Sequence, residues 1–167
     1  SFFFMYIFFR SQTQIIIKLE GGKRNVLHQE IIQTSQRQGI IPLTIHQINN
    51  ELKEDSSFDN QPFYTISIVG RLEAYHRENN SNMFKFCDGT GKIQGRINLT
   101  GGKMPAFAEG INFEANINNY YFVVFKPRFA DGEKKFYIQM IKPVTNYNII
   151  SKHFSDVILS TLIRRRN

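Results

Sequence analysis

The chain has 167 residues and a formal net charge of +7, with 16 Phe and 7 Tyr but no Trp. This length fits one domain with extensions, and the aromatic enrichment favours β-strands. The single cysteine, Cys87, excludes an internal disulfide, and the four histidines show no metal-ligand spacing. We therefore expect no metal and no other cofactor, while the excess of Lys and Arg favours a polyanionic partner.

Residues 1–38 fit no domain pattern and are interpreted as an N-terminal extension. They contain two strand-like runs, at 2–9 and 14–19. The first run is wholly apolar, but it is far shorter than the roughly 20 residues that a membrane-spanning helix needs. No basic region precedes it and no small-residue cleavage site follows it, so it does not match a signal peptide. We therefore expect no contact with a membrane.

A domain is predicted over residues 39–143, and it begins with a short leader helix. Thr44 and Gln47 have the spacing of a capping box, in which the Thr hydroxyl and the Gln amide each satisfy a backbone donor. Ile45 and Ile48 then fall on the side of the helix that is directed toward the core.

A polar loop at 51–61 leads into five predicted strands. The first strand contains Gly70, where we expect a bulge or sharp bend because the strand is shared between two halves of a barrel. A tight hairpin signal at 88–91 joins the second and third strands, and a short helix is expected near 105–109. A long bent first strand followed by a short meander is typical of a small closed barrel. The predicted strands cover 63–75, 83–88, 92–99, 120–128 and 135–141.

Residues 144–167 are predicted as an oligomerisation helix, regular over about 146–164. A second apolar set at Ile149, Leu159 and Ile163 lies off the main apolar stripe. Two apolar faces on one terminal helix indicate that more than its own barrel covers it, as in a bundle with helices of other chains. The alternative is a helix buried within its own domain. The main stripe, predicted as a partner interface, contains Ile150, Phe154, Val157, Ile158 and Leu162.

The order of these features resembles a known family, the middle subunit of replication protein A, over residues 39–163. The resemblance implies a mainly β fold, a five-stranded OB-fold barrel with a short leader helix and a C-terminal helix for three-helix-bundle assembly. The residues that carry it are the leader 42–48, Ile68-Val69-Gly70, Phe84-Lys85-Phe86-Cys87-Asp88 before Thr90, Tyr121, Pro143 and the helix from Ile150 to Ile158.

The same resemblance implies partners and a location. The partners are a large and a small OB-fold subunit, held through the C-terminal helix, and single-stranded DNA, which this chain binds weakly on its own. The location is the nucleus, on the chromosome, in replication, repair or telomere maintenance. A similar subunit serves a telomerase-associated complex, which adds telomerase recruitment to the expected roles.

Nucleic-acid binding by such a barrel needs cations beside aromatic rings, so that phosphates are neutralised while bases stack. In the family, an aromatic near the end of the third strand stacks on a base, but this sequence has Leu99 and Thr100 there. A second family aromatic, near the loop between the fourth and fifth strands, is matched by Phe129. Stacking contributes about 1–3 kcal/mol per base, so losing one of two platforms implies weak binding. The predicted nucleic-acid-binding residues are Arg71, Arg77, Lys85, Arg96, Lys126, Arg128, Phe129, Lys134 and Lys135.

No catalytic pattern stands out, and we expect neither enzyme activity nor a small-molecule substrate. The 88–91 segment lacks the glycine–lysine pattern of a phosphate loop and leads into a strand. His153, Ser155 and Asp156 lie too close along one helix to form a catalytic triad. Two other functions stay open. One is the anticodon-binding OB domain of an aminoacyl-tRNA synthetase, which 84–94 also resembles, and the other is the Stn-type subunit of a telomere-capping complex.

Overall fold

The computed structural model describes residues 39–53, 57–58, 61–62, 65–130 and 132–165. The predicted N-terminal extension, with its two strand-like runs, lies outside the described residues. The barrel and the C-terminal helix belong to one compact unit, Gln38–Asn167.

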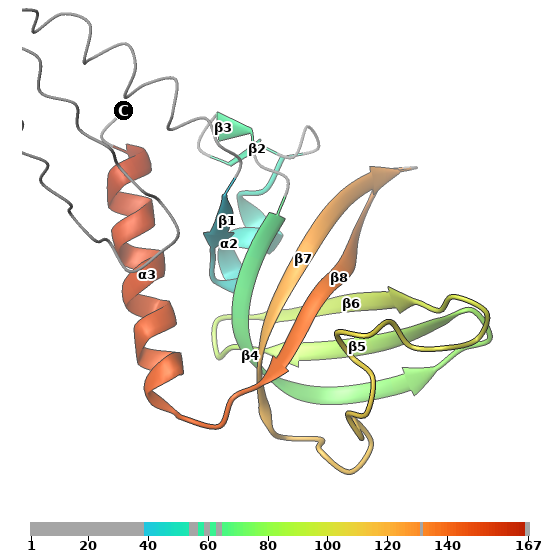
Figure 1. Cartoon of the computed structure of the whole chain (residues 1–167). Helices are drawn as coiled ribbons and strands as arrows, with labels where there is room; N and C mark the ends of the chain where they lie inside the picture. Colours follow the sequence, from blue (N-terminus) through green and yellow to red (C-terminus); the bar gives the residue numbers. More distant parts are fainter. Residues whose placement is uncertain (1–38, 54–56, 59–60, 63–64, 131, 166–167) are drawn as a thin grey trace, which may run out of the picture. The chain divides into compact units, whose positions relative to one another are not determined.

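Five strands close into a barrel, as predicted (Figure 1). Neighbouring strands pair in the order β4, β5, β6, β8, β7, and β4 pairs again with β7, which closes the sheet. Among these pairs β6 and β8 run parallel and the others are antiparallel. A five-stranded barrel of this kind is the OB-fold architecture. The strands are β4 (Thr65–Arg77), β5 (Ser81–Cys87), β6 (Lys92–Asn98), β7 (Tyr120–Ala130) and β8 (Glu133–Pro143).

Strand β4 changes its partner part-way along its length. Residues Ile66–Arg71 pair with β7, and Arg71–Arg77 pair with β5. The register of the second pairing shifts at Glu73, so the bulge lies there and not at Gly70, while the sharp bend predicted as the alternative at Gly70 stays a prediction. Gly70 instead allows β4 and β5 to approach closely, because a Cβ at this position would lie 3.3 Å from the backbone oxygen of Cys87. A side chain there would crowd the neighbouring strand.

Aromatic side chains fill the interior of the barrel. Phe84 and Phe86 on β5 and Phe125 on β7 are at most 1% exposed. Phe86 meets Phe125 edge to face with 6.2 Å between ring centroids, and Phe84 meets Phe113 in the same way at 4.9 Å. A Cβ on Gly95 of β6 would lie only 2.6 Å from the Phe125 ring. The size of these rings therefore requires glycine at this point of β6.

The leader helix α2 (Ile45–Asn50) starts as predicted. The Thr44 hydroxyl accepts from the backbone N–H of Gln47, and the Gln47 side chain accepts from the backbone N–H of Thr44, so the capping box is confirmed. Ile45 and Ile48 are fully buried. This short helix is therefore held by its cap and by two core side chains.

The hairpin at 88–91 joins β5 to β6 and also caps α2. The Asp88 carboxylate accepts from the backbone N–H of Ile45 at 2.8 Å, and the Thr90 hydroxyl accepts from that of His46 at 3.1 Å. Gly89 has a φ of 88°, which an L side chain rarely adopts. This segment, which superficially resembles a phosphate loop, therefore serves the fold.

Three segments differ from the predicted pattern. The residues before the leader helix form β1 (Ile40–Pro42), which pairs in parallel with β4. The predicted loop at 51–61 contains a two-stranded ribbon of β2 (Ser57–Phe58) and β3 (Gln61–Pro62). The helix predicted near 105–109 is a series of turns. Glycines with positive φ flank these turns, which suits turns rather than a regular helix.

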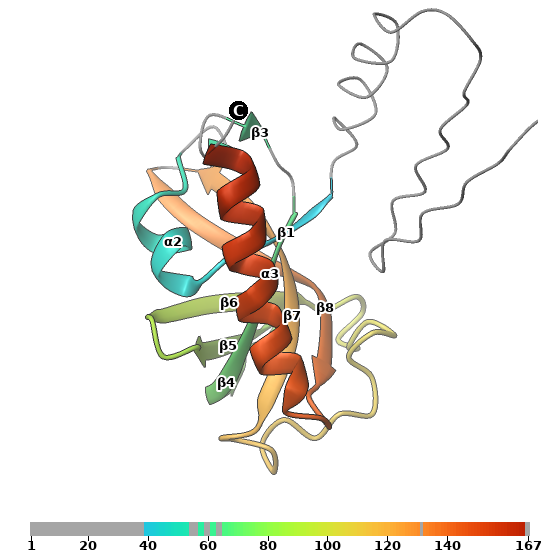
Figure 2. The same cartoon turned by 90° about the vertical axis from the view of Figure 1, so that its left-hand side faces the viewer.

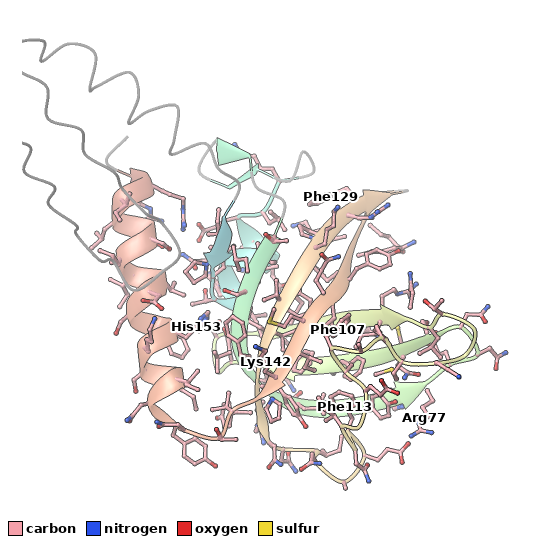
Figure 3. The ribbon with its side chains drawn as sticks, in the orientation of Figure 1. Arg77, Phe107, Phe113, Phe129, Lys142 and His153 are labelled. Carbon is pink, nitrogen blue, oxygen red and sulfur yellow. The ribbon has the colours of Figure 1, made fainter. Side chains whose placement is uncertain are left out.

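The C-terminal helix α3 (Asn148–Arg165) lies beside β1 and β4 (Figure 2). His153 points from α3 toward the barrel (Figure 3), and its Nε2–H donates to the backbone oxygen of Leu43 at 3.3 Å. Val157 is 5% exposed and Arg164 is 8% exposed. One side of the helix thus packs against its own domain. Because Val157 lies on that side, its predicted role in a partner interface is wrong.

Candidate nucleic-acid interface

The strand register brings four side chains into one row across the outside of the barrel. Arg96 on β6 pairs with Met83 on β5 and with Tyr137 on β8, and Tyr137 pairs with Lys126 on β7. Residues paired across a sheet direct their side chains to the same face. Phe136, next to Tyr137, is buried in the core cluster, so the row faces outward. We call Met83, Arg96, Tyr137 and Lys126 the Tyr137 row.

Tyr137 is the aromatic side chain of this row, and it was not among the predicted binding residues. It is half-buried, and the guanidinium carbon of the exposed Arg128 lies 5.7 Å from its ring centroid. This distance is within the range of a cation–π contact. The alternation of apolar residues around it, with Phe136 and Ile138 buried, is a sequence signal that Tyr137 faces outward. The sequence gives no signal for its cationic neighbours, because they lie on other strands.

Three predicted cations, Arg96, Lys126 and Arg128, gather around Tyr137. Within the described residues, no carboxylate forms an ion pair with any of them. Like charges so close together repel one another unless an anion lies between them. The cluster is therefore suited to phosphate.

The other predicted cations mostly have partners already. Arg71 pairs with Glu73 at 3.4 Å, Arg77 with Glu114 at 3.1 Å and Lys135 with Glu133 at 3.7 Å, while the Lys134 ammonium donates to the Asn49 backbone oxygen at 3.2 Å. Arg77 lies at the far end of β4 (Figure 3). Exposed ion pairs of this kind contribute little to stability, but each of the three carboxylates offsets part of the positive charge.

A hollow of about 360 Å³ lies over β4, β5 and β6 and continues the Tyr137 row. Met83 belongs to both, and Lys85, Gln94 and His76 line the hollow as well. Lys85 is exposed and pairs across the sheet with Gln94. The hollow and the Tyr137 row thus form one continuous surface, with Lys85 on one side and the cations around Tyr137 on the other.

The bulge residue Glu73 binds the cations at one end of this surface. Its carboxylate contacts the Lys92 ammonium at 2.9 Å as well as Arg71. The hydrogen bond from Lys92 holds the pKa of Glu73 below its ordinary value, and the same contact raises the pKa of Lys92. These two cations are therefore less suited to phosphate than those around Tyr137.

Phe129, the predicted stacking residue, and Tyr75 of β4 have other contacts. Phe129, near the tip of the β7–β8 hairpin (Figure 3), is packed partly against the core cluster. The Tyr75 ring lies 5.0 Å from that of Phe84 and 5.5 Å from that of Phe113. The role of Phe129 in base stacking stays a prediction. Tyr75 packs against the core cluster through its contacts with Phe84 and Phe113.

The outer side of α3 carries a second candidate surface, suited to a protein partner. Ile158, Leu159, Leu162 and Ile163 are 52–62% exposed. With 3.6 residues per turn, these four share one side of the helix, opposite the buried Val157. We call them the α3 outer face.

The predicted partner stripe coincides only in part with this surface. Ile158 and Leu162 belong to it, whereas Val157 lies on the opposite side and Ile150 and Phe154 are half-buried. The remaining apolar members, Leu159 and Ile163, come from the set that the sequence placed off the main stripe. The structure therefore divides the apolar residues of the helix differently from the prediction, because the α3 outer face takes two residues from each predicted set.

Within the described residues, no three His, Cys, Asp or Glu side chains lie close enough to hold a metal ion. No helix among them is long and apolar enough to cross a membrane.

No family model and no curated relative matches the sequence. The structure is similar to solved structures of low sequence identity. A chain of a replication protein A heterotrimer bound to single-stranded DNA has a TM-score of 0.60 at 21% identity, over 75% of this chain and 98% of that one. The similarity therefore concerns the whole length of that subunit. The chain has the OB-fold.

Two further similar structures support this fold. A chain of the S. pombe Stn1–Ten1 complex has a TM-score of 0.63 at 14% identity, over 77% of this chain and 99% of that one. A chain of yeast replication protein A bound to single-stranded DNA has a TM-score of 0.57 at 24% identity, over 74% and 89%. At identities this low, the structural similarity establishes the architecture alone. The function has to be argued from the surfaces described above.

Proposed function

We propose that the chain is a non-enzymatic, structural and single-stranded-DNA-binding subunit of a heterotrimer similar to replication protein A. The main support for this proposal is that one side of α3 packs against the barrel while the α3 outer face stays exposed. A contiguous apolar surface of this kind marks a protein interface. Helices of a large and a small OB-fold partner packed against it would form a three-helix bundle.

The barrel supports the DNA-binding part of this proposal. Arg96, Lys126 and Arg128 have no described carboxylate partner and surround an outward aromatic ring. This combination suits a strand with exposed bases. The small number of such groups fits a weak contact that adds to those of the partner subunits.

In this role the protein works in the nucleus, in replication, repair or telomere maintenance, including telomerase recruitment. A Stn-type subunit of a telomere-capping complex is the second candidate, favoured by the TM-score of 0.63 with the Stn1–Ten1 structure. The candidates differ in their partners. The first requires two OB-fold chains, and the second requires a Ten1-like chain.

Leu162→Asp tests the assembly. It places a carboxylate in the middle of the α3 outer face, where burial against a partner helix costs several kcal/mol. The tagged full chain is recovered from the source cell and its partners are identified by mass spectrometry. Thr145→Asp, an exposed position before α3, is the matched control.

We expect the wild type and Thr145→Asp to recover two OB-fold partners in equal amounts, and Leu162→Asp to recover neither. A circular dichroism spectrum confirms that the variant remains folded. Recovery of a Ten1-like chain alone supports the second candidate. Identical partners for all three proteins, or a wild-type monomer, contradict the proposed interface.

A further inference from the structure

Tyr137, on the outside of the barrel, has three cations as neighbours. Arg96 and Lys126 pair with it from the two adjacent strands, and Arg128 lies over the ring. Directly opposed side chains in a sheet have Cβ atoms about 5 Å apart, so the cations lie within reach of any group on the ring. The described residues hold no carboxylate that pairs with these cations.

A nucleotide in a single strand has the matching features. Its base is a flat ring that stacks on an aromatic side chain, and a phosphate follows on either side of it. A guanidinium is also flat and stacks on aromatic faces, so Arg128 occupies the place over Tyr137 that a base would take. Arg77 also lies over a ring, that of Tyr75 at 6.0 Å, but it pairs with Glu114 as well. Arg128 lies over Tyr137, and no carboxylate among the described residues pairs with it.

We propose that Tyr137 is the base-stacking platform of this barrel. A base of single-stranded DNA takes the place of the Arg128 guanidinium over the ring, and Arg128 then meets a phosphate together with Arg96 and Lys126. This platform on β8 replaces the aromatic that the third strand lacks at Leu99. The inference rests on the proposed DNA-binding function and names the residues that perform it.

The test uses the full chain at low salt and two labelled oligomers of equal length, oligo(dT) and an abasic strand with the same phosphates. Fluorescence anisotropy gives the affinity for each. Tyr137→Phe keeps the ring, Tyr137→Leu keeps apolar cover without a ring, and Tyr137→Ala removes both. Tyr147→Ala removes a tyrosine that is 72% exposed and lies before α3, and it is the matched control.

We expect Tyr137→Ala and Tyr137→Leu to bind oligo(dT) about 5- to 100-fold more weakly, as expected for one lost stacking contact. Their affinity for the abasic strand and the salt dependence of binding should not change, because no charge is removed. Tyr137→Phe and Tyr147→Ala should bind both oligomers as the wild type does. Arg96→Gln with Lys126→Gln should lower the salt slope by about one to two units on both oligomers.

The possible failures are distinct. If the wild type does not bind oligo(dT) at low salt, the proposed DNA-binding function fails, and the platform fails with it. If the wild type binds and Tyr137→Leu binds equally well, the function stands and the platform is wrong. If Tyr137→Leu weakens binding to both oligomers equally, the side chain supports the shape of the barrel, and stacking is again excluded.

Discussion

The substitution Asp88→Ala tests whether the 88–91 hairpin secures the leader helix. One carboxylate oxygen accepts from the backbone N–H of Ile45 at 2.8 Å, and the other accepts from those of Thr90 at 2.8 Å and Gly91 at 3.2 Å. The Thr90 hydroxyl also donates to this carboxylate at 2.7 Å, and alanine removes all four contacts. Loss of a helix N-cap costs about 0.5–2 kcal/mol, and since this side chain caps both α2 and the turn, we expect about 2 kcal/mol.

Urea denaturation followed by circular dichroism measures this loss as a change in the free energy of unfolding. A decrease of about 2 kcal/mol should also lower the melting temperature by roughly 7 °C. Glu109→Ala, at an exposed turn, is the matched control and should change the free energy by at most about 0.5 kcal/mol. An Asp88→Ala protein as stable as Glu109→Ala would refute the role given to this carboxylate.

Three further predictions concern stability and binding. Gly95→Ala places a Cβ 2.6 Å from the Phe125 ring, and calorimetry should show a loss of about 1–3 kcal/mol. Burial lowers the pKa of His153 below its ordinary 6.5, so the unfolded chain takes up the proton first and the free energy of unfolding should fall as pH drops below 6.5. His153→Gln should reduce that dependence, and an unchanged profile would exclude His153 as its cause. Arg71→Gln with Arg77→Gln should weaken oligo(dT) binding less than Arg96→Gln with Lys126→Gln, because both arginines have carboxylate partners; an equal loss would contradict this ranking.

The barrel was predictable because its signals are local. Alternating apolar residues located all five strands, and the spacing of Thr44 and Gln47 located the leader helix. The bulge was misplaced to Gly70 because a glycine also serves close approach of two strands, and sequence does not separate these two uses. The segment near 105–109 has a helix-like start, but the glycines around it adopt positive φ and it forms turns.

The candidate site was less predictable because it depends on pairings between distant strands. Tyr137 gains its cationic neighbours from the parallel pairing of β8 with β6 and from its register with β7. In α3 the sequence shows two apolar faces of similar character. The packing of His153 and Val157 on the barrel leaves open a face that contains residues of both predicted sets.

The stoichiometry of the native assembly tests the central claim most directly. Native mass spectrometry of the tagged full chain recovered from the source cell, with and without added oligo(dT), measures partners and DNA together. The account expects one copy of this chain with two OB-fold chains, and a mass increase of one oligomer when oligo(dT) is added. A single chain that carries neither partner nor oligomer would contradict it.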